Sequence, residues 1–176
     1  EEFPEEELPS IEAIEDVQNI SAADTSIVDD MTTLLAYIQM HSAEVAGNGF
    51  TPQAVQRMIP YLLRQGHIRL SFLLGIGISA NLSTTQEGKA YPRRTEARQW
   101  LSATRAEQTR QLAQAWFESK HYRDLWHIPG LFPDDSGWAY DPVLARNSVM
   151  SMFTELVPEQ GWSSVNALID MIKEIE

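Results

Sequence analysis

The sequence predicts a mostly α-helical protein with one small β-hairpin. Apolar residues recur every three or four positions along most of the chain, which is typical of helices that bury one face. Two helix starts combine a capping side chain with proline at the first helical position, at Thr51-Pro52 and Asp141-Pro142. A polar run that turns at Glu87-Gly88 and returns through a basic segment predicts the hairpin.

The elements follow from these signals in chain order. We expect helices at about 27–40, 52–65, 68–80, 95–101 and 104–119, and two more that begin near 142 and 163. Gln65-Gly66 ends the second helix, and Pro158 to Gly161 separates the last two. We expect a very short strand at 43–46 and the two strands of the hairpin at 81–84 and 89–93.

Three helices carry more specific signals. The helix at 68–80 is apolar on nearly every side, so it should be packed on several sides, with Gly75 and Gly77 at close helix approaches. Thr104 and Glu107 have the spacing of a capping box. The faces expected to point inward comprise Ala106, Leu112, Ala113, Trp116 and Phe117; Val143, Leu144, Val149, Met150, Phe153 and Leu156; and Val165, Leu168, Ile169, Ile172 and Ile175.

The order helix, short strand, helix, helix, hairpin is that of a winged helix, a helix-turn-helix variant in which the hairpin forms the wing. We therefore predict an acidic linker or arm at 1–25, a winged-helix domain at 26–120, a linker loop at 121–140 and a second helical, winged-helix-like unit at 141–176. The last helical pattern stops without a cap, so this second unit is expected to be truncated and the chain to be a fragment of a longer protein.

The net charge of −12 is unevenly distributed. Residues 1–30 hold eleven carboxylates and no Lys or Arg, so the other 146 residues, with fourteen carboxylates and thirteen basic groups, have a net charge of −1. Such asymmetry can mark a nucleic-acid surface together with an acidic arm that competes for it, and we expect the first twenty residues either to be poorly packed or to cover a basic surface. The alternative is a solvated helix face beside a solubilising linker.

No pattern of residues predicts catalysis. The sequence has no phosphate-binding loop, no G-x-S-x-G serine and no cysteine. His121 and His127 lack the spacing that places two metal ligands on one helical face, and Asp134-Asp135 lack the ligand spacing of a calcium loop. We therefore expect no enzymatic activity, no metal and no cofactor. The absence of cysteine, of a signal peptide and of a long apolar run favours a cytoplasmic protein without membrane contact.

A family resemblance rests on four segments: TLLAYIQ, FTPQAVQRMIPYLL, RLSFLLGIGISANL and RQWLSATRAEQTRQLAQAWFES. With DLWHIPGL and GWAYDPVLARNSV after them, they resemble the helicase-associated winged-helix regions of bacterial proteins related to the N-terminal part of XPB-type DNA repair helicases. The resemblance covers about 26–176 and implies a winged-helix module that contacts DNA or a partner protein. No helicase motor motif is present in these residues.

The leading hypothesis is a non-catalytic accessory module that binds nucleic acid or nucleoprotein through a basic wing. Its expected contacts are to the phosphate backbone, because the third helix has few polar side chains with which to read base edges. The alternative is a protein–protein interaction or assembly domain whose partner is another protein or another domain of the same chain. The candidate nucleic-acid-binding residues are Lys89, Arg93, Arg94, Arg98 and Arg105.

Overall fold

The structure, a computed structural model, describes residues 11–14, 17, 24–127, 141–157 and 161–175. Over these residues the chain is mostly helical, with seven α-helices and two small two-stranded antiparallel hairpins. It divides into two compact units. The larger unit lies within 23–143, and the smaller unit joins segments of 1–22 and 144–176.

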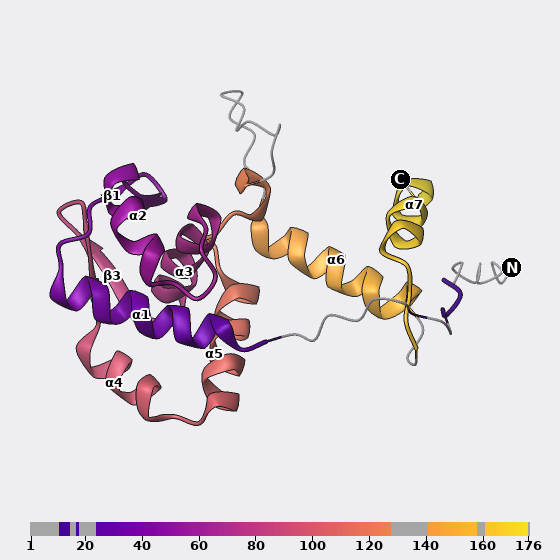
Figure 1. Cartoon of the computed structure of the whole chain (residues 1–176). Helices are drawn as coiled ribbons and strands as arrows, with labels where there is room; N and C mark the ends of the chain where they lie inside the picture. The colour runs from indigo at the N-terminus through magenta and orange to yellow at the C-terminus, as the bar shows by residue number, and fades with distance from the viewer. Residues whose placement is uncertain (1–10, 15–16, 18–23, 128–140, 158–160, 176) are drawn as a thin grey trace, which may run out of the picture. The chain divides into compact units, whose positions relative to one another are not determined.

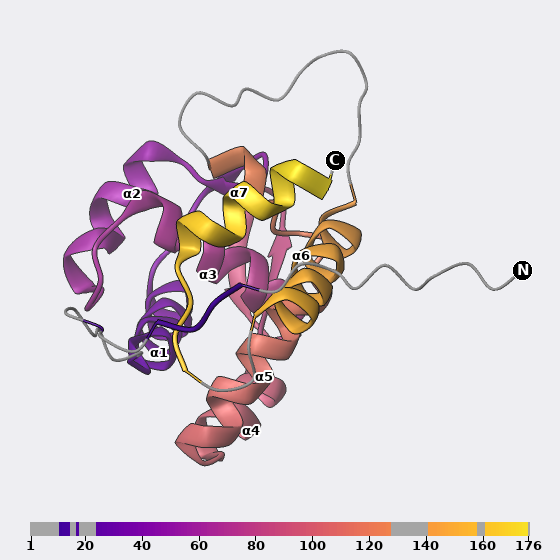
Figure 2. The same ribbon diagram turned by 90° about the vertical axis from the view of Figure 1, so that its right-hand side faces the viewer.

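The larger unit is built around helix α3 (His67–Ser79), which is buried along most of its length. Helices α1 (Ser26–Met40) and α5 (Arg105–Glu118) both pack against it, as do the hairpin strands (Figures 1 and 2). The core includes Met31, Leu34, Leu70, Leu73 and Ile76, each at most 1% exposed. The prediction that this helix is packed on several sides is confirmed.

The two glycines of α3 lie at close approaches, but the segments that approach them most closely are not helices as predicted: Tyr122 follows α5 and Ser83 begins strand β3 (Ser83–Gln86). A Cβ atom added at Gly75 would lie 2.9 Å from Cβ of Tyr122, and one at Gly77 would lie 2.9 Å from Oγ of Ser83. Glycine is therefore required at Gly75 because the backbone of the segment after α5 reaches the helix surface there.

Helix α2 (Pro52–Met58) begins as predicted, with Oγ1 of Thr51 accepting a hydrogen bond from the backbone N–H of Ala54 at 3.3 Å. It ends earlier than predicted and continues only as a single 3-10 turn, η1 (Ile59–Tyr61). Pro60 explains the difference, because proline has no N–H to continue the α-helical hydrogen bonds. Leu63, which lies within the predicted helix, comes after this turn and is exposed.

The wing is the hairpin of β3 (Ser83–Gln86) and β4 (Lys89–Pro92), which turns at Glu87-Gly88 as predicted. The short strand predicted before α2 is instead a second tiny hairpin of β1 (Val45–Ala46) and β2 (Gly49–Phe50). Its first residues also lie beside the wing, because the N–H of Val45 donates to O of Gly88 at 2.8 Å and the N–H of Ala90 donates to O of Ala43 at 3.0 Å. The wing is thus held to the segment that follows α1.

Two helices follow the wing, α4 (Arg94–Ser102) and α5. The predicted capping box at the start of α5 is confirmed, since Oγ1 of Thr104 accepts from the N–H of Glu107 and Glu107 accepts from the N–H of Thr104. The predicted buried face of α5 is partly wrong. Ala106 and Ala113 are exposed, and the buried positions are Gln108, Leu112 and Ala115. The side-chain amide of Gln108 donates to O of Trp100 at 2.9 Å, so a polar residue fills the position nearest α4.

The smaller unit contains α6 (Pro142–Leu156), most of which belongs to it, and α7 (Val165–Ile175). Their predicted starts are confirmed by hydrogen bonds from the N–H of Val143 to Asp141 and from the N–H of Ala167 to Ser164. Most of the predicted inward residues are exposed, however: Leu144, Val149, Met150, Phe153, Val165 and Ile169. Only Leu156 and Leu168 are buried among those described, because this core is a small cluster completed by Ile11.

Ile11 belongs to the segment expected to be a linker or arm. Its N–H donates to O of Leu156 at 3.0 Å, and Ile14 pairs with Trp162 in a β-bridge. Ile11 is thus packed in one cluster with Leu156 and Leu168, whereas Glu12, Ala13 and Ile14 are exposed. The rest of the predicted arm, apart from Val17 and residues 24–25, lies outside the described residues.

Candidate nucleic-acid interface

Six of the thirteen Lys and Arg residues lie between Lys89 and Arg110, and the fold separates them into different environments. Lys89 lies on β4, Arg93 precedes α4, Arg94 and Arg98 lie on α4, and Arg105 and Arg110 lie on α5. The predicted binding residues therefore come from strand β4, from helix α4 and the residue before it, and from helix α5. Two of the six share their surroundings with carboxylates: Arg105 with Asp29, and Arg110 with Glu96 and Glu118.

Arg105 is occupied by contacts inside the protein. Its Nη1 donates to Oδ1 of Asp29 at 2.7 Å, its Nη2 pairs with Oδ2 of the same carboxylate, and its Nε donates to Oγ1 of Thr25 at 2.8 Å. The hydrogen bonds from Arg105 hold the pKa of Asp29 below its usual range, and Asp29 raises the pKa of Arg105. Of the predicted candidates, Arg105 is thus the one whose charge is already compensated, at the start of α1.

Arg110 lies in a different hollow, which it shares with Glu96 and Glu118. This hollow has both signs of charge and is separate from the residues on the wing. Arg64 and Arg69, on or before α3, are also paired, with Asp24 and Asp30 respectively. Carboxylates at the start of α1 therefore compensate three arginines of the larger unit.

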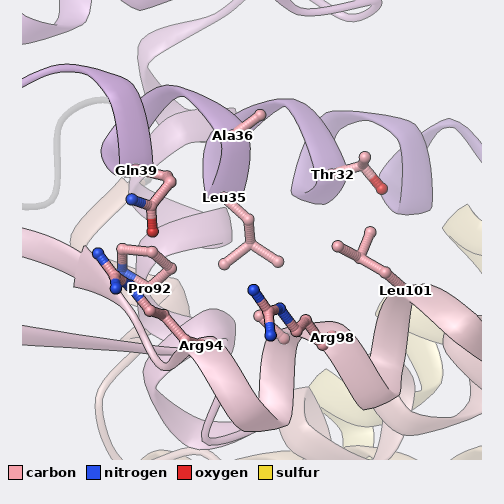
Figure 3. Close-up of a pocket in the computed structure, with 9 residues that line it drawn as sticks. Thr32, Leu35, Ala36, Gln39, Pro92, Arg94, Arg98 and Leu101 are labelled. Atoms are coloured by element: carbon pink, nitrogen blue, oxygen red, sulfur yellow. The ribbon is translucent and has the colours of Figure 1, made fainter.

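Arg94 and Arg98 line a hollow between α1 and the β4–α4 segment (Figure 3), and Lys89 and Arg94 line a second hollow next to it. The two hollows, of about 420 and 360 Å³, share Gln39, Pro92 and Arg94. Arg94 and Arg98 are both exposed, and Figure 3 shows their guanidinium groups in the space between the two helices. None of the described residues that line the two hollows is acidic. We call the two hollows together the α1–α4 groove.

The floor and rim of the α1–α4 groove are largely apolar. Leu35, Ala97 and Leu101 line the first hollow. Tyr91 and Met40 line the second and are 41% and 70% exposed. None of these residues is among the predicted binding residues. For Tyr91 the available signal is the alternation of β4, in which Ala90 is buried and Lys89 and Tyr91 share the opposite face.

Arg93 is exposed but does not line the groove. Its N–H donates to O of Leu82 at 2.8 Å, which positions the backbone where the wing meets α4. Among the described residues, neither Arg93 nor Arg94 forms an ion pair with Glu87 or Glu96. No ion pair within that part of the chain involves Lys89, Arg93, Arg94 or Arg98.

No group of three or more His, Asp or Glu side chains that could hold a metal occurs in the part of the chain that the structure describes. The predicted turn at Asp134-Asp135 lies outside that part, and so does the loop around it. None of the described helices is both long and apolar enough to cross a membrane.

Comparison of the chain with family models, curated proteins and solved structures gives no match. The resemblance to helicase-associated winged-helix regions therefore stays a prediction from the residues.

Proposed function

We propose that the chain is a non-catalytic accessory module that binds the phosphate backbone of nucleic acid through Lys89, Arg93, Arg94 and Arg98. The observation that carries the proposal is the separation of the basic residues into compensated and uncompensated sets. Arg64, Arg69 and Arg105 are neutralised by Asp24, Asp30 and Asp29, whereas these four cations gather beside the wing without a carboxylate partner among the described residues. Uncompensated cations on one surface attract a polyanion by releasing its counterions.

The order of elements supports a winged-helix fold for the larger unit as part of this proposal. Helix α1, the 43–45 segment, α2, α3 and the β3–β4 hairpin follow one another, and the 43–45 segment pairs with the second strand of the hairpin. A winged helix that reads bases uses polar side chains on its third helix. In α3 the exposed positions are only His67 and Ile68, which favours contacts to phosphates over contacts to bases.

A salt titration tests the proposal. Fluorescence anisotropy with labelled oligonucleotides should show micromolar binding at 50 mM salt, falling steeply as salt is added and depending little on sequence. Replacing Arg93 and Arg94 together by Ala should weaken binding to all sequences alike and reduce the salt slope by about two units. The matched control replaces Arg57 and Lys120, two exposed cations away from the groove, and should leave the slope nearly unchanged. No binding by the wild-type chain would refute the proposal.

A second candidate function has its own observation. The exposed apolar residues of α6 and α7 include Leu144, Phe153, Val165 and Ile169, each at least 43% exposed. Exposed apolar residues gathered on one unit favour an interface with a protein partner or another domain of the same chain. Concentration-dependent self-association or a stable complex with a separately expressed domain, lost when Leu144 and Phe153 are replaced by Ser, would support this candidate.

A further inference from the structure

The α1–α4 groove contains apolar and aromatic side chains that a nucleic-acid duplex would not contact. A double helix presents phosphates on its outside and hides the faces of its bases, so cations alone suffice to hold it. The groove instead combines cations with an apolar floor and an exposed aromatic ring. These are the two elements of proteins that bind single strands, in which a basic channel follows the backbone and aromatic or apolar side chains contact the bases.

The positions of the groove residues follow this division. Arg94 and Arg98 are four residues apart on α4, which places them about 6 Å apart along the helix axis. That spacing is comparable to the distance between neighbouring phosphates along one strand. Leu35 and Leu101 line the first hollow beside these two arginines, and Tyr91 lines the second hollow beside Lys89. Each hollow therefore offers a cation for a phosphate and one exposed apolar or aromatic side chain for a base, Leu101 in the first and Tyr91 in the second.

Tyr91 is the side chain best placed to stack on a base. It lies on β4 and is 41% exposed, so part of its ring is open to solvent. Tyr37 and Tyr61, the other tyrosines near α1, contact each other with ring centroids 5.9 Å apart, whereas Tyr91 has no ring contact among the described residues. The absence of acidic lining residues means that nothing described in the groove repels a phosphate.

We infer that the α1–α4 groove binds single-stranded nucleic acid in preference to duplex, with Tyr91 stacking on a base and Lys89, Arg94 and Arg98 contacting the backbone. The inference rests on the proposed function, because it names the class of nucleic acid that three of the same cations, Lys89, Arg94 and Arg98, would bind. It places the binding surface between α1 and the β4–α4 segment. Helix α3 has no part in it.

The test compares four fluorescent probes with the whole 176-residue chain at 50 mM salt: a single-stranded oligothymidine, a mixed-sequence single strand, the duplex of that strand, and an oligoglutamate peptide. Both single strands should bind at least tenfold more tightly than the duplex, and the peptide should bind more weakly still. Tyr91→Ala should weaken single-strand binding by at least about fivefold and leave duplex binding unchanged.

Tyr61→Ala is the matched control, because Tyr61 is an exposed tyrosine outside the groove, and it should leave all affinities unchanged. Circular dichroism of each variant verifies that the fold is intact.

The outcomes separate the two ideas. Equal affinity for single strand and duplex, with no effect of Tyr91→Ala, overturns the single-strand inference but leaves the proposed function in place. Absence of binding to every nucleic acid overturns both. Oligoglutamate binding as tight as that of the single strands also overturns the inference, because the groove would then be a site for acidic peptides.

Discussion

Nε of Arg69 donates a hydrogen bond to Oδ2 of Asp30 at 2.9 Å, and the Asp30 side chain is completely buried. The same carboxylate accepts from the N–H of Leu63 at 2.7 Å. One acidic side chain of α1 therefore holds both the first turn of α3 and the segment that connects α2 to α3. This contact fixes the geometry of the helix pair on which the wing is built.

Replacing Asp30 by Ala should lower the free energy of unfolding by about 3 kcal/mol, because the N–H of Leu63 and the guanidinium of Arg69 would both lose their buried acceptor. Urea denaturation followed by circular dichroism measures the loss. Asp29→Ala is the control, since it removes an aspartate from the same helix at a half-exposed position, and its cost should be clearly smaller. Equal costs would show that the buried contact is not what stabilises the connection.

The two tryptophans after the wing should differ in their contributions to stability. Trp100 is largely buried, at 2% exposed. Trp116 is only partly buried, and its Nε1 donates to Asp124 at 3.2 Å. Trp100→Ala should cost about 3–5 kcal/mol, whereas Trp116→Ala should cost about 1–2 kcal/mol. Thermal and urea unfolding of the two variants side by side provide the comparison, and a larger loss at Trp116 would contradict it.

Gly75→Ala should destabilise the chain although alanine favours helices. The added Cβ would lie 2.9 Å from Cβ of Tyr122, a contact that neither side chain can relieve by rotation. We expect a net loss of about 1–2 kcal/mol in urea unfolding, the overpacking cost exceeding the helix-propensity gain. Gly66→Ala is the control, because the nearest atom there is Cβ of Arg69 at 3.9 Å. A stabilised Gly75→Ala variant would mean that the Tyr122 segment can move away from α3.

The Asp29–Arg105 pair predicts a pH dependence of stability. Because the hydrogen bonds from Arg105 lower the pKa of Asp29 in the folded state, the pair stabilises the fold fully above the unfolded pKa of about 3.9. This stability should be lost as the pH falls below that value and through the folded pKa. Asp29→Asn should therefore flatten the stability profile between about pH 4 and pH 2, measured by urea unfolding at each pH. A profile identical to wild type would show that the pair forms too rarely to matter.

Arg105 should contribute less to nucleic-acid binding than Arg94, although the sequence predicts both as binding residues. Asp29 already compensates Arg105, whereas Arg94 lies in the α1–α4 groove without a carboxylate among the described lining residues. Arg94→Ala should reduce the salt slope by about one unit and Arg105→Ala by much less. Anisotropy titrations at three or more salt concentrations determine both slopes. Equal reductions would indicate that the ligand displaces Asp29 from Arg105.

The local signals in the sequence determined the elements. Thr51-Pro52, the Thr104 and Glu107 capping box and the turn at Glu87-Gly88 act within a few residues, so each start and turn could be read without knowing its neighbours. The apolar sequence of α3 likewise predicted a helix packed on several sides, because its composition can be read without knowing its neighbours. The mostly helical fold class follows from the number of such signals.

Tertiary structure decided which surfaces those elements share. The basic residues from Lys89 to Arg110 look alike in the sequence, but their surroundings in the fold differ. Arg105 forms an ion pair with Asp29, Arg110 lines a hollow together with Glu96, and Arg94 lines the α1–α4 groove. Likewise, no local pattern predicted that Ile11 would complete the cluster of Leu156 and Leu168. Ion pairs and core contacts join residues that are far apart in the chain, so they depend on how the helices pack against each other. Helical periodicity is a local property and carries no information about that packing.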